Sequence, residues 1–453
     1  PAQGPSGFSA KAFGGRDALP KRMDDPAQAA GWSRRSPLRG RCDTMKETRG
    51  VDLTEGSVGK RLLLYFLPIL ASSLFQQLYT TVDAVILGQF AGKTGLAAID
   101  AVYSFLKLPV NFFVGLSAGT TILISQFFGA RDHSSLSRAV HTGIGFALAG
   151  GLALSVLGFL AAPLCLKAME VPRELFDLSL SYVRILFGGF ALSMLYNVGA
   201  GILRAVGDSK TPFYVLIAAG GANVVLDLVL VAIFKMNAPG AALATVCAQG
   251  LSAALVLRVL LRTRAPYRVS GAELRVDKAM LHSICRIGLP VGLQSALYPV
   301  ANMMVQSGIN RTGTDNIAAW ALCGKLDFLI WLIADSLSEA VATFVEQNHG
   351  AGKYARTRYG VRVGLFMTVG FIALVSAALF FGSVSLGRLL INPADLDIAF
   401  EAGRIMHFLA PLYCLYAIGE VYAGAIRGTG ETFRPMLITL LGTGFLTFVV
   451  VGP

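Results

Sequence analysis

Long apolar runs, separated by short polar segments, dominate the chain from residue 62 onward. A helix needs about 20 apolar residues to cross a bilayer, so each run predicts one membrane-spanning helix. Pro68, Pro109 and Pro290 lie inside runs and predict kinks, because proline leaves a carbonyl in the preceding turn without its donor. We count eleven runs, with approximate limits 62–88, 95–128, 136–166, 174–203, 212–234, 239–261, 281–310, 316–348, 359–390, 397–426 and 435–453.

The composition agrees with this pattern. The 453 residues are 54% hydrophobic and 15% charged, whereas a soluble protein carries about 25% charged residues. A net charge of +12 would suit a nucleic-acid-binding protein, but the basic residues cluster between the apolar runs, as they do in the loops of membrane proteins. We therefore expect contact with the lipid bilayer, no nucleic-acid partner, and an all-α polytopic membrane protein.

The loops between the runs alternate in charge. One alternate set holds 15 Lys and Arg residues and the other holds 6. Because cytoplasmic loops carry an excess of Lys and Arg, we expect the basic set and the N-terminus to be cytoplasmic. This predicts a multi-pass protein of the cell inner (plasma) membrane.

An internal repeat organises the runs. GILRAVGDSKTP (201–212) matches GAIRGTGETFRP (424–435) at an offset of 223, and SQFFGARDHSSLSRAV matches EQNHGAGKYARTRYGV at an offset of 221. The offset spans six helices, so both halves enter the membrane in the same sense. We predict two parallel six-helix lobes in a twelve-helix fold, of which about eleven helices are present because the last is missing.

The repeat and the loops divide the chain. We expect a polar N-terminal extension over 1–55, disordered or, over 1–44, an artefact of the reading frame. The N-lobe, with helices 1–6, covers 56–265, and a cytoplasmic linker follows over 266–280. The C-lobe, with helices 7–11, covers 281–453.

One carboxylate stands inside the first apolar run. Asp83 lies about 21 residues into it, and a charge in hydrocarbon costs at least ~2.5 kcal/mol, so Asp83 should face the lobe interior or a water-filled cavity. Removal from water favours the protonated form of a carboxyl group, which makes Asp83 a candidate cation-coupling residue. A helix–helix hydrogen bond is the structural alternative.

Two further polar pairs occur in the first half. Asn223 and Asp227 are four residues apart and share a helix face, and their oxygens are suitable ligands for a hard cation. Thr245 and Gln249 have the same spacing. Thr245 alone would serve equally well by bonding its own i−4 carbonyl.

The second half carries its own polar set. Asp335 and Glu339 are four residues apart in the eighth run, and Glu420 lies in the tenth. These acids are candidates for a cavity that receives a cationic substrate. Arg204 and Arg427 occupy equivalent places in the repeat, where interfacial anchoring is the simplest role.

No catalytic or metal-binding pattern is present in the sequence. The six cysteines form no CxxC pair and no zinc pattern with histidine, so we expect no disulfide, no metal and no other cofactor. No Ser-His-Asp or paired-carboxylate enzyme arrangement can be argued, and we expect a protein that is not an enzyme. The cysteines are Cys42, Cys165, Cys247, Cys285, Cys323 and Cys414.

Several motifs, in this order and spacing, resemble the multidrug and toxic compound extrusion (MATE) transporters. They are TTVDAVILGQF, SQFFGARD, GILRAVGDSKTP, NVVLDLVLVAIF and GAALATVCAQ, and the resemblance extends from about residue 56 to the end. It implies a twelve-helix antiporter that couples Na⁺ or H⁺ entry to the efflux of cationic or amphipathic organic compounds. It also implies a cation-coupling cluster at the positions of Asp83, Asn223, Asp227 and Thr245.

The resemblance is incomplete in the second half. Some relatives carry an acid in the seventh span, where this chain has Gln294 and Gln306. We therefore expect no cation site at the seventh span, and cation coupling at the first-lobe cluster. We also expect a monomer. The expected substrate cavity comprises Gln249, Gln294, Asp335, Glu339 and Glu420. The alternative function is a flippase for lipid-linked precursors, which would need a strongly cationic cavity.

Overall fold

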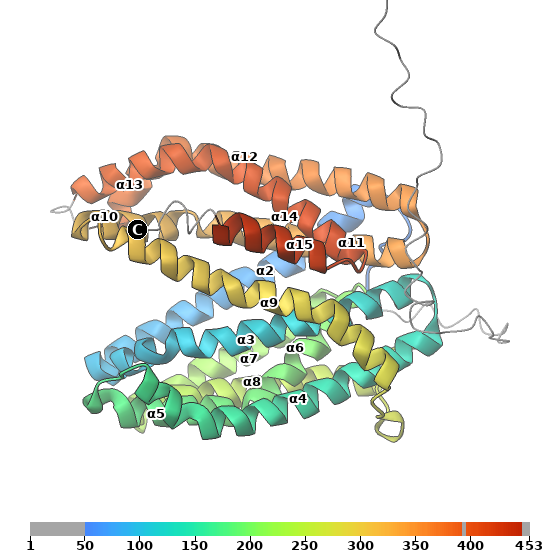
Figure 1. The fold of residues 1–453 in the computed structure, drawn as a ribbon, viewed down its shortest axis with the longest axis horizontal. Coiled ribbons are helices and arrows are strands. Elements are labelled where there is room, and N and C mark those ends of the chain that lie inside the picture. The colour runs from blue at the N-terminus through green and yellow to red at the C-terminus, as the bar shows by residue number, and fades with distance from the viewer. Residues whose placement is uncertain (1–49, 392–395, 446–453) are drawn as a thin grey trace, which may run out of the picture. The chain divides into compact units, whose positions relative to one another are not determined.

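Every regular element in residues 50–391 and 396–445, the part of the chain that the computed structural model describes, is a helix (Figure 1). The all-α prediction is confirmed for these residues, whereas the tail over 1–49 and residues 446–453 lie outside them. In chain order the elements are α2 (Val58–Ile86), η2 (Leu87–Ala91), α3 (Gly92–Gly129), α4 (His133–Ala168), α5 (Arg173–Gly188), α6 (Phe190–Ala205), α7 (Lys210–Asp227), η3 (Leu228–Ile233), α8 (Asn237–Arg262), η4 (Gly271–Glu273), α9 (Lys278–Ile309), α10 (Thr314–Leu326), α11 (Phe328–Gly350), α12 (Tyr354–Leu390), α13 (Leu396–Leu409), η6 (Ala410–Leu412), α14 (Tyr413–Gly428), α15 (Phe433–Thr439) and η7 (Leu440–Phe445).

Most of the predicted spans are long and apolar enough to cross a membrane. Eight helices meet this condition among the described residues, and the pair α5–α6 makes a ninth. That pair bends by 45° at Gly189, where a Cβ atom would collide with the side chain of Val246. The helices continue through Pro68, Pro109 and Pro290. The bend at Gly189 was not among the kinks that the sequence predicted.

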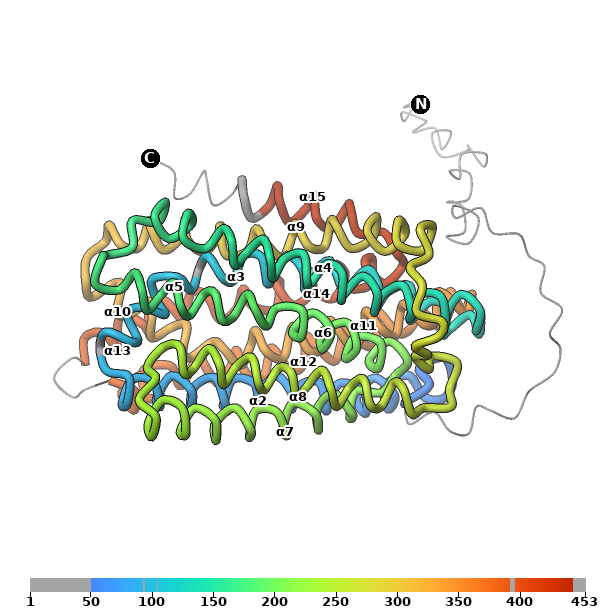
Figure 2. Tube along the Cα trace, turned by 90° about the horizontal axis from the view of Figure 1, so that it is seen from below, coloured from blue at the N-terminus to red at the C-terminus, as the bar shows by residue number. Residues whose placement is uncertain are grey.

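The helices form two lobes, as the repeat predicts. Helices α3 to α8 pack on one another, and helices α10 to α14 form a second group, drawn above the first in Figure 1. Seen from below, both groups run along one common direction (Figure 2). The predicted basic loops that join α3 to α4, α8 to α9 and α11 to α12 lie together at the right of Figure 1, which we call the basic end.

Helix α2 crosses from one lobe to the other. Its first half lies in the hydrophobic core of the second lobe, where Leu62, Tyr65 and Phe66 pack in one cluster with residues such as Phe344 of α11. Its second half packs against α7 of the first lobe. The predicted N-lobe, which begins at residue 56, assigned the whole helix to the first lobe.

Residues 50–57, which we call the strap, precede α2 and are held in place by the lobes. The side chain of Leu53 is fully buried in the core of the second lobe. The Val51 N–H donates to the Gly207 carbonyl of the first lobe at 2.9 Å. Residues 50–55, which were expected to belong to the disordered extension, are therefore packed against both lobes.

The outer faces of the helices are apolar. On α12 the side chains of Phe366, Leu374, Phe381 and Leu389 are between 71% and 84% exposed, and they recur every seven or eight residues, which keeps them on one side of the helix. Exposed apolar surface of this extent marks contact with an apolar partner. Together with the length of the spans, it indicates a protein embedded in a lipid bilayer.

Candidate functional site

Asp83 of α2 and Asp227 of α7 meet inside the first lobe. The side chain of Asp227 is fully buried and that of Asp83 is half-buried. Their carboxyl groups lie close enough to interact with each other. Neither oxygen of Asp227 has a hydrogen-bond partner among the described residues.

Asn223 adds an amide to this pair. It lies one turn before Asp227 on α7 and is 5% exposed. Its Nδ2 lacks a hydrogen-bond partner within the described part of the chain, and so does Asp83 Oδ1. A buried polar atom without a partner costs about 1–3 kcal/mol. The site therefore holds carboxylate oxygens that a small cation or a proton would satisfy, beside an amide N–H that needs an acceptor.

A π-helical segment follows each acid. Segment η2 starts at Leu87, one turn after Asp83, and segment η3 starts at Leu228, immediately after Asp227. The two segments pack against each other. Each segment forms the C-terminal end of its span, just after the acid. No residue pattern in the sequence predicted them.

Two tyrosines face the acids and were not predicted as site residues. Tyr182 of α5 lies near both Asp83 and Asp227, and Tyr79 of α2 lies near Asp83. Both hydroxyl groups are therefore close enough to the carboxyl groups to feel their charge. The only signal in the sequence was a polar aromatic residue inside an apolar run.

Thr245 and Gln249 lie on the helix next to α7. Both side chains are half-buried on α8, which packs beside α7. Within residues 50–391 and 396–445 the structure contains no hydrogen bond from Thr245 to Asp83, Asn223 or Asp227. Their roles in coupling and in the cavity therefore stay predictions.

The acids of the second half gather around two arginines. Glu339 of α11 forms an ion pair with Arg204 of α6 at 2.8 Å, although Arg204 Nε is not aligned for a hydrogen bond. Glu420 of α14 lies 3.7 Å from Arg427 and accepts a hydrogen bond from Tyr298 of α9 at 3.4 Å. The two repeat-related arginines thus form ion pairs with acids, whereas the sequence suggested only interfacial anchoring.

The remaining predicted cavity residues differ in exposure. Asp335 is exposed on α11 and faces Glu339, Glu420 and Arg427. Gln294 is 4% exposed, and its Nε2 donates to Thr439 Oγ1 of α15 at 3.0 Å. Asp335 is therefore open to its surroundings, whereas the amide of Gln294 joins α9 to α15.

The described part of the chain contains no group of three or more His, Cys, Asp or Glu residues arranged to hold a metal ion. Cys165, Cys247, Cys285, Cys323 and Cys414 are free thiols, and Cys42 lies outside the described residues.

Known proteins share both the sequence pattern and the fold. The chain is 27% identical over 394 residues to "Probable multidrug resistance protein YoeA" of Bacillus subtilis, covering 85% of this chain and 84% of that protein. It is 24% identical to "Multidrug export protein MepA" of Staphylococcus aureus, covering 88% and 87%. A solved structure described as the "Outward-facing conformation of a multidrug resistance MATE family transporter of the MOP superfamily" superposes with a TM-score of 0.82 at 20% identity, covering 88% of this chain and 90% of that chain.

The family model described as MatE matches the chain twice, over residues 68–229 and again over residues 290–451. The two matches are displaced by the same interval as the internal repeat, which confirms the duplication of the lobes. They also cover most of the chain, including the helices that carry Asp83, Asn223, Asp227, Asp335 and Glu420. This chain therefore belongs to the MATE family of membrane transporters.

Proposed function

We propose that this protein is a multidrug efflux antiporter that couples the entry of Na⁺ or H⁺ to the export of cationic or amphipathic organic compounds. The carboxyl pair Asp83–Asp227 carries the proposal, because it places two acids close together inside one lobe, one of them fully buried. The relatives named as multidrug resistance and multidrug export proteins support the direction of transport.

The charge balance of the pair gives it affinity for a cation. Two like charges 4 Å apart repel by about 4 kcal/mol at an effective dielectric constant of 20, so two ionised carboxylates in contact are unstable together. A proton or a Na⁺ ion removes this repulsion and supplies a partner for the oxygen atoms that lack one. Hard cations prefer such oxygen ligands.

Helix α2 connects the cation site to the second lobe. Asp83 lies in the half of α2 that packs on α7, while Leu62, Tyr65 and Phe66 anchor the other half in the core of the second lobe. A change in packing at Asp83 therefore acts on both lobes through one continuous helix. Coupling requires that cation and substrate favour different states of the protein, and a shared helix offers a direct connection.

The second lobe supplies the substrate surface in this proposal. Its acids Asp335, Glu339 and Glu420 outnumber the two arginines that contact them, Arg427 of the same lobe and Arg204 of the first lobe, so the surface keeps a negative charge that suits cationic compounds. A flippase for pyrophosphate-linked precursors would need the opposite sign. Gln249 and Thr245 complete the proposed lining and coupling sets.

The charge of the loops orients the molecule in the proposal. The basic end faces the cytoplasm of the cell, with the N-terminus on that side, because loops rich in Lys and Arg are retained there. The protein acts in the plasma membrane as a monomer. Residues 130–132 and 351–353 then lie at the cytoplasmic surface.

Dye efflux from reconstituted vesicles tests this function. The wild type should expel a cationic dye under a pure Na⁺ gradient or under a pure pH gradient, and the gradient that works identifies the ion. The Asp227→Asn variant should lose the gradient-driven efflux. The Glu174→Gln variant, which changes an exposed acid of α5, should keep it. Wild-type efflux in Asp227→Asn under the effective gradient would refute the proposal.

A further inference from the structure

At the basic end, the last turns of α3 and α11 touch backbone to backbone. A Cβ atom added to Gly129 of α3 would collide with the backbone of Gln347, and one added to Gly350 of α11 would collide with the backbone of Gln126. The two contacts are related by the internal repeat, because SQFFG in the first lobe corresponds to EQNHG in the second. We call Gln126, Gly129, Gln347 and Gly350 the lobe contact.

Hydrogen bonds across the lobes close this contact. Gln347 Nε2 donates to the Ala205 carbonyl at the end of α6 at 2.8 Å. In the equivalent place, Gln126 Nε2 donates to the Gly428 carbonyl at the end of α14 at 3.0 Å. Both bonds are buried and join opposite lobes, so they exist only while the two lobes meet at the basic end.

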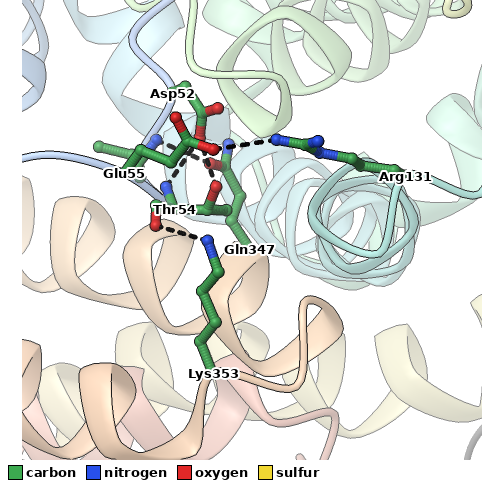
Figure 3. Close-up of polar contacts among 7 residues, drawn as sticks. Asp52, Thr54, Glu55, Arg131, Gln347 and Lys353 are labelled. Atoms are coloured by element: carbon green, nitrogen blue, oxygen red, sulfur yellow. Dashed lines mark hydrogen bonds and ion pairs between the residues drawn. The ribbon is translucent and has the colours of Figure 1, made fainter. Parts of the chain in front are cut away.

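The strap seals the same place from outside (Figure 3). The Leu53 N–H donates to Gln347 Oε1 at 3.2 Å, and Lys353 Nζ donates to the Thr54 carbonyl at 2.9 Å. Glu55 pairs with Arg131 of the first lobe at 3.0 Å. A surface pocket of about 360 Å³, lined by Thr54, Glu55, Gly129–Arg131, Gly350, Ala351 and Lys353, lies directly beyond the lobe contact.

A carboxyl group is buried within this sealed region. Glu346 precedes Gln347 on α11 and is 4% exposed, and Ser125, its counterpart in the repeat, is fully buried on α3. The two side chains face each other across the lobes. Neither Glu346 Oε2 nor Ser125 Oγ has a hydrogen-bond partner of normal geometry among the described residues.

The charged groups around Glu346 have other partners. Arg427 of α14, Glu339 of α11 and Tyr65 of α2 face it. Arg427 also lies 3.7 Å from Glu420, while Arg204 of α6 forms its ion pair with Glu339.

On α12, the side chains nearest to this region point toward the strap. Arg356 donates to the Gly56 carbonyl at 2.8 Å, as Lys353 does to the Thr54 carbonyl. An ionised carboxylate buried without a dedicated cation is costly. The closed contact therefore favours the neutral form of Glu346.

We propose that Glu346 is a proton-binding site separate from the Asp83–Asp227 pair. Its carboxyl group holds a proton while the ends of α3 and α11 meet, and it releases that proton to the cytoplasm through the pocket when the lobes part. The inference rests on the orientation proposed above and on the parting of the lobes during transport, and it does not depend on the identity of the coupling ion.

The direction of the effect follows from proton linkage. The closed contact binds one proton more than the open form, so acid stabilises the closed contact and alkali favours its opening. One linked proton changes the ratio of closed to open molecules by up to about tenfold per pH unit. Glu346→Gln keeps the shape and neutral charge of the protonated side chain, so this variant should stay closed at every pH.

Spin-label distances across the basic end test the proposal. Labels at Ser134→Cys and Ala355→Cys, two exposed positions beside the lobe contact, would be placed in a variant whose native cysteines are replaced. In lipid nanodiscs, the long-distance population should grow from pH 6 to pH 9 in the wild type. It should stay small throughout in Glu346→Gln, and Glu273→Gln in the exposed linker should behave as the wild type.

Two further variants separate the possible outcomes. The double variant Asp83→Asn/Asp227→Asn should keep the pH dependence of the distance. If the double variant loses this pH dependence while Glu346→Gln keeps it, the titrating group is the coupling pair and the proposal is wrong. Glu346→Ser reproduces the residue of the first lobe and replaces Glu346→Gln if the latter fails to fold. A wild-type distance that does not respond to pH would also overturn the proposal.

Discussion

Removal of the Gln347 side chain should open the basic end of the protein. The Gln347→Ala substitution deletes the bond from Nε2 to the Ala205 carbonyl at 2.8 Å and the bond from the Leu53 N–H to Oε1 at 3.2 Å. Both bonds are buried, so the carbonyl and the N–H that remain have no partner in the closed form. After the lobes part, both groups can bond to water.

The magnitude follows from these two groups. A buried polar group without a partner costs about 1–3 kcal/mol, so the closed form should lose about 2–6 kcal/mol relative to the open form. Even the lower bound of about 2 kcal/mol corresponds to a change of about 30-fold in the ratio of closed to open molecules. Gln126→Ala deletes only the bond to the Gly428 carbonyl and should change the ratio by at least about fivefold at about 1 kcal/mol.

The spin-label distance between positions 134 and 355 measures this ratio at fixed pH. The order of opening should be Gln347→Ala, then Gln126→Ala, then the wild type. Gln306→Ala is the matched control, because its side chain bonds only to Asn310 at the far end of α9. Equal distance distributions in Gln347→Ala and the wild type, or a larger effect of Gln126→Ala, would refute the reasoning.

Three further variants test other parts of the account. Gly350→Ala should open the basic end in the same distance assay, because its Cβ would collide with the Gln126 backbone, whereas Gly324→Ala meets nothing within 4 Å and should not. Phe66→Ala should destabilise the protein by about 3–5 kcal/mol and lower its thermal unfolding midpoint in detergent, while Phe366→Ala, at a side chain 79% exposed, should have little effect. Glu420→Gln should weaken the binding of cationic dyes, measured by fluorescence titration, and leave neutral dyes unaffected; equal losses for both would contradict the proposed cavity.

Much of the fold could be predicted because membrane insertion constrains the pattern of apolar and basic residues along the sequence. Apolar runs of spanning length, basic loops and a repeated GILRAVGDSKTP motif each follow from bilayer thickness, loop charge or duplication. The position of Asp83 could be predicted on the same basis, because a carboxylate in hydrocarbon must face an interior. Its approach to Asp227 depended on how α2 and α7 pack, which only the resemblance suggested.

Other features depend on packing that has no signature along the chain. The π-helical turns after Asp83 and Asp227 arise from how α2 and α7 fit against their neighbours. The crossing of α2 into the core of the second lobe could not be predicted, because Leu62 and Tyr65 would be equally apolar in either lobe. Glu346 was not predicted as a functional residue, because it lies at the end of an apolar run, where an acid usually marks an exposed helix end. Its burial depends on contact with Ser125 of the other lobe.

Cation entry driven by the substrate is the most direct test of the central claim, that the Asp83–Asp227 pair couples one cation to transport. Vesicles with an outwardly directed dye gradient and no ion gradient should accumulate the coupling ion, measured with an internal pH or Na⁺ indicator. Coupling free energies are typically about 1–3 kcal/mol, so loss of coupling should reduce this uptake by about 5- to 150-fold. The reduction should be similar in Asp83→Asn, Asp227→Asn and the double variant. Wild-type uptake in either single variant would contradict the account.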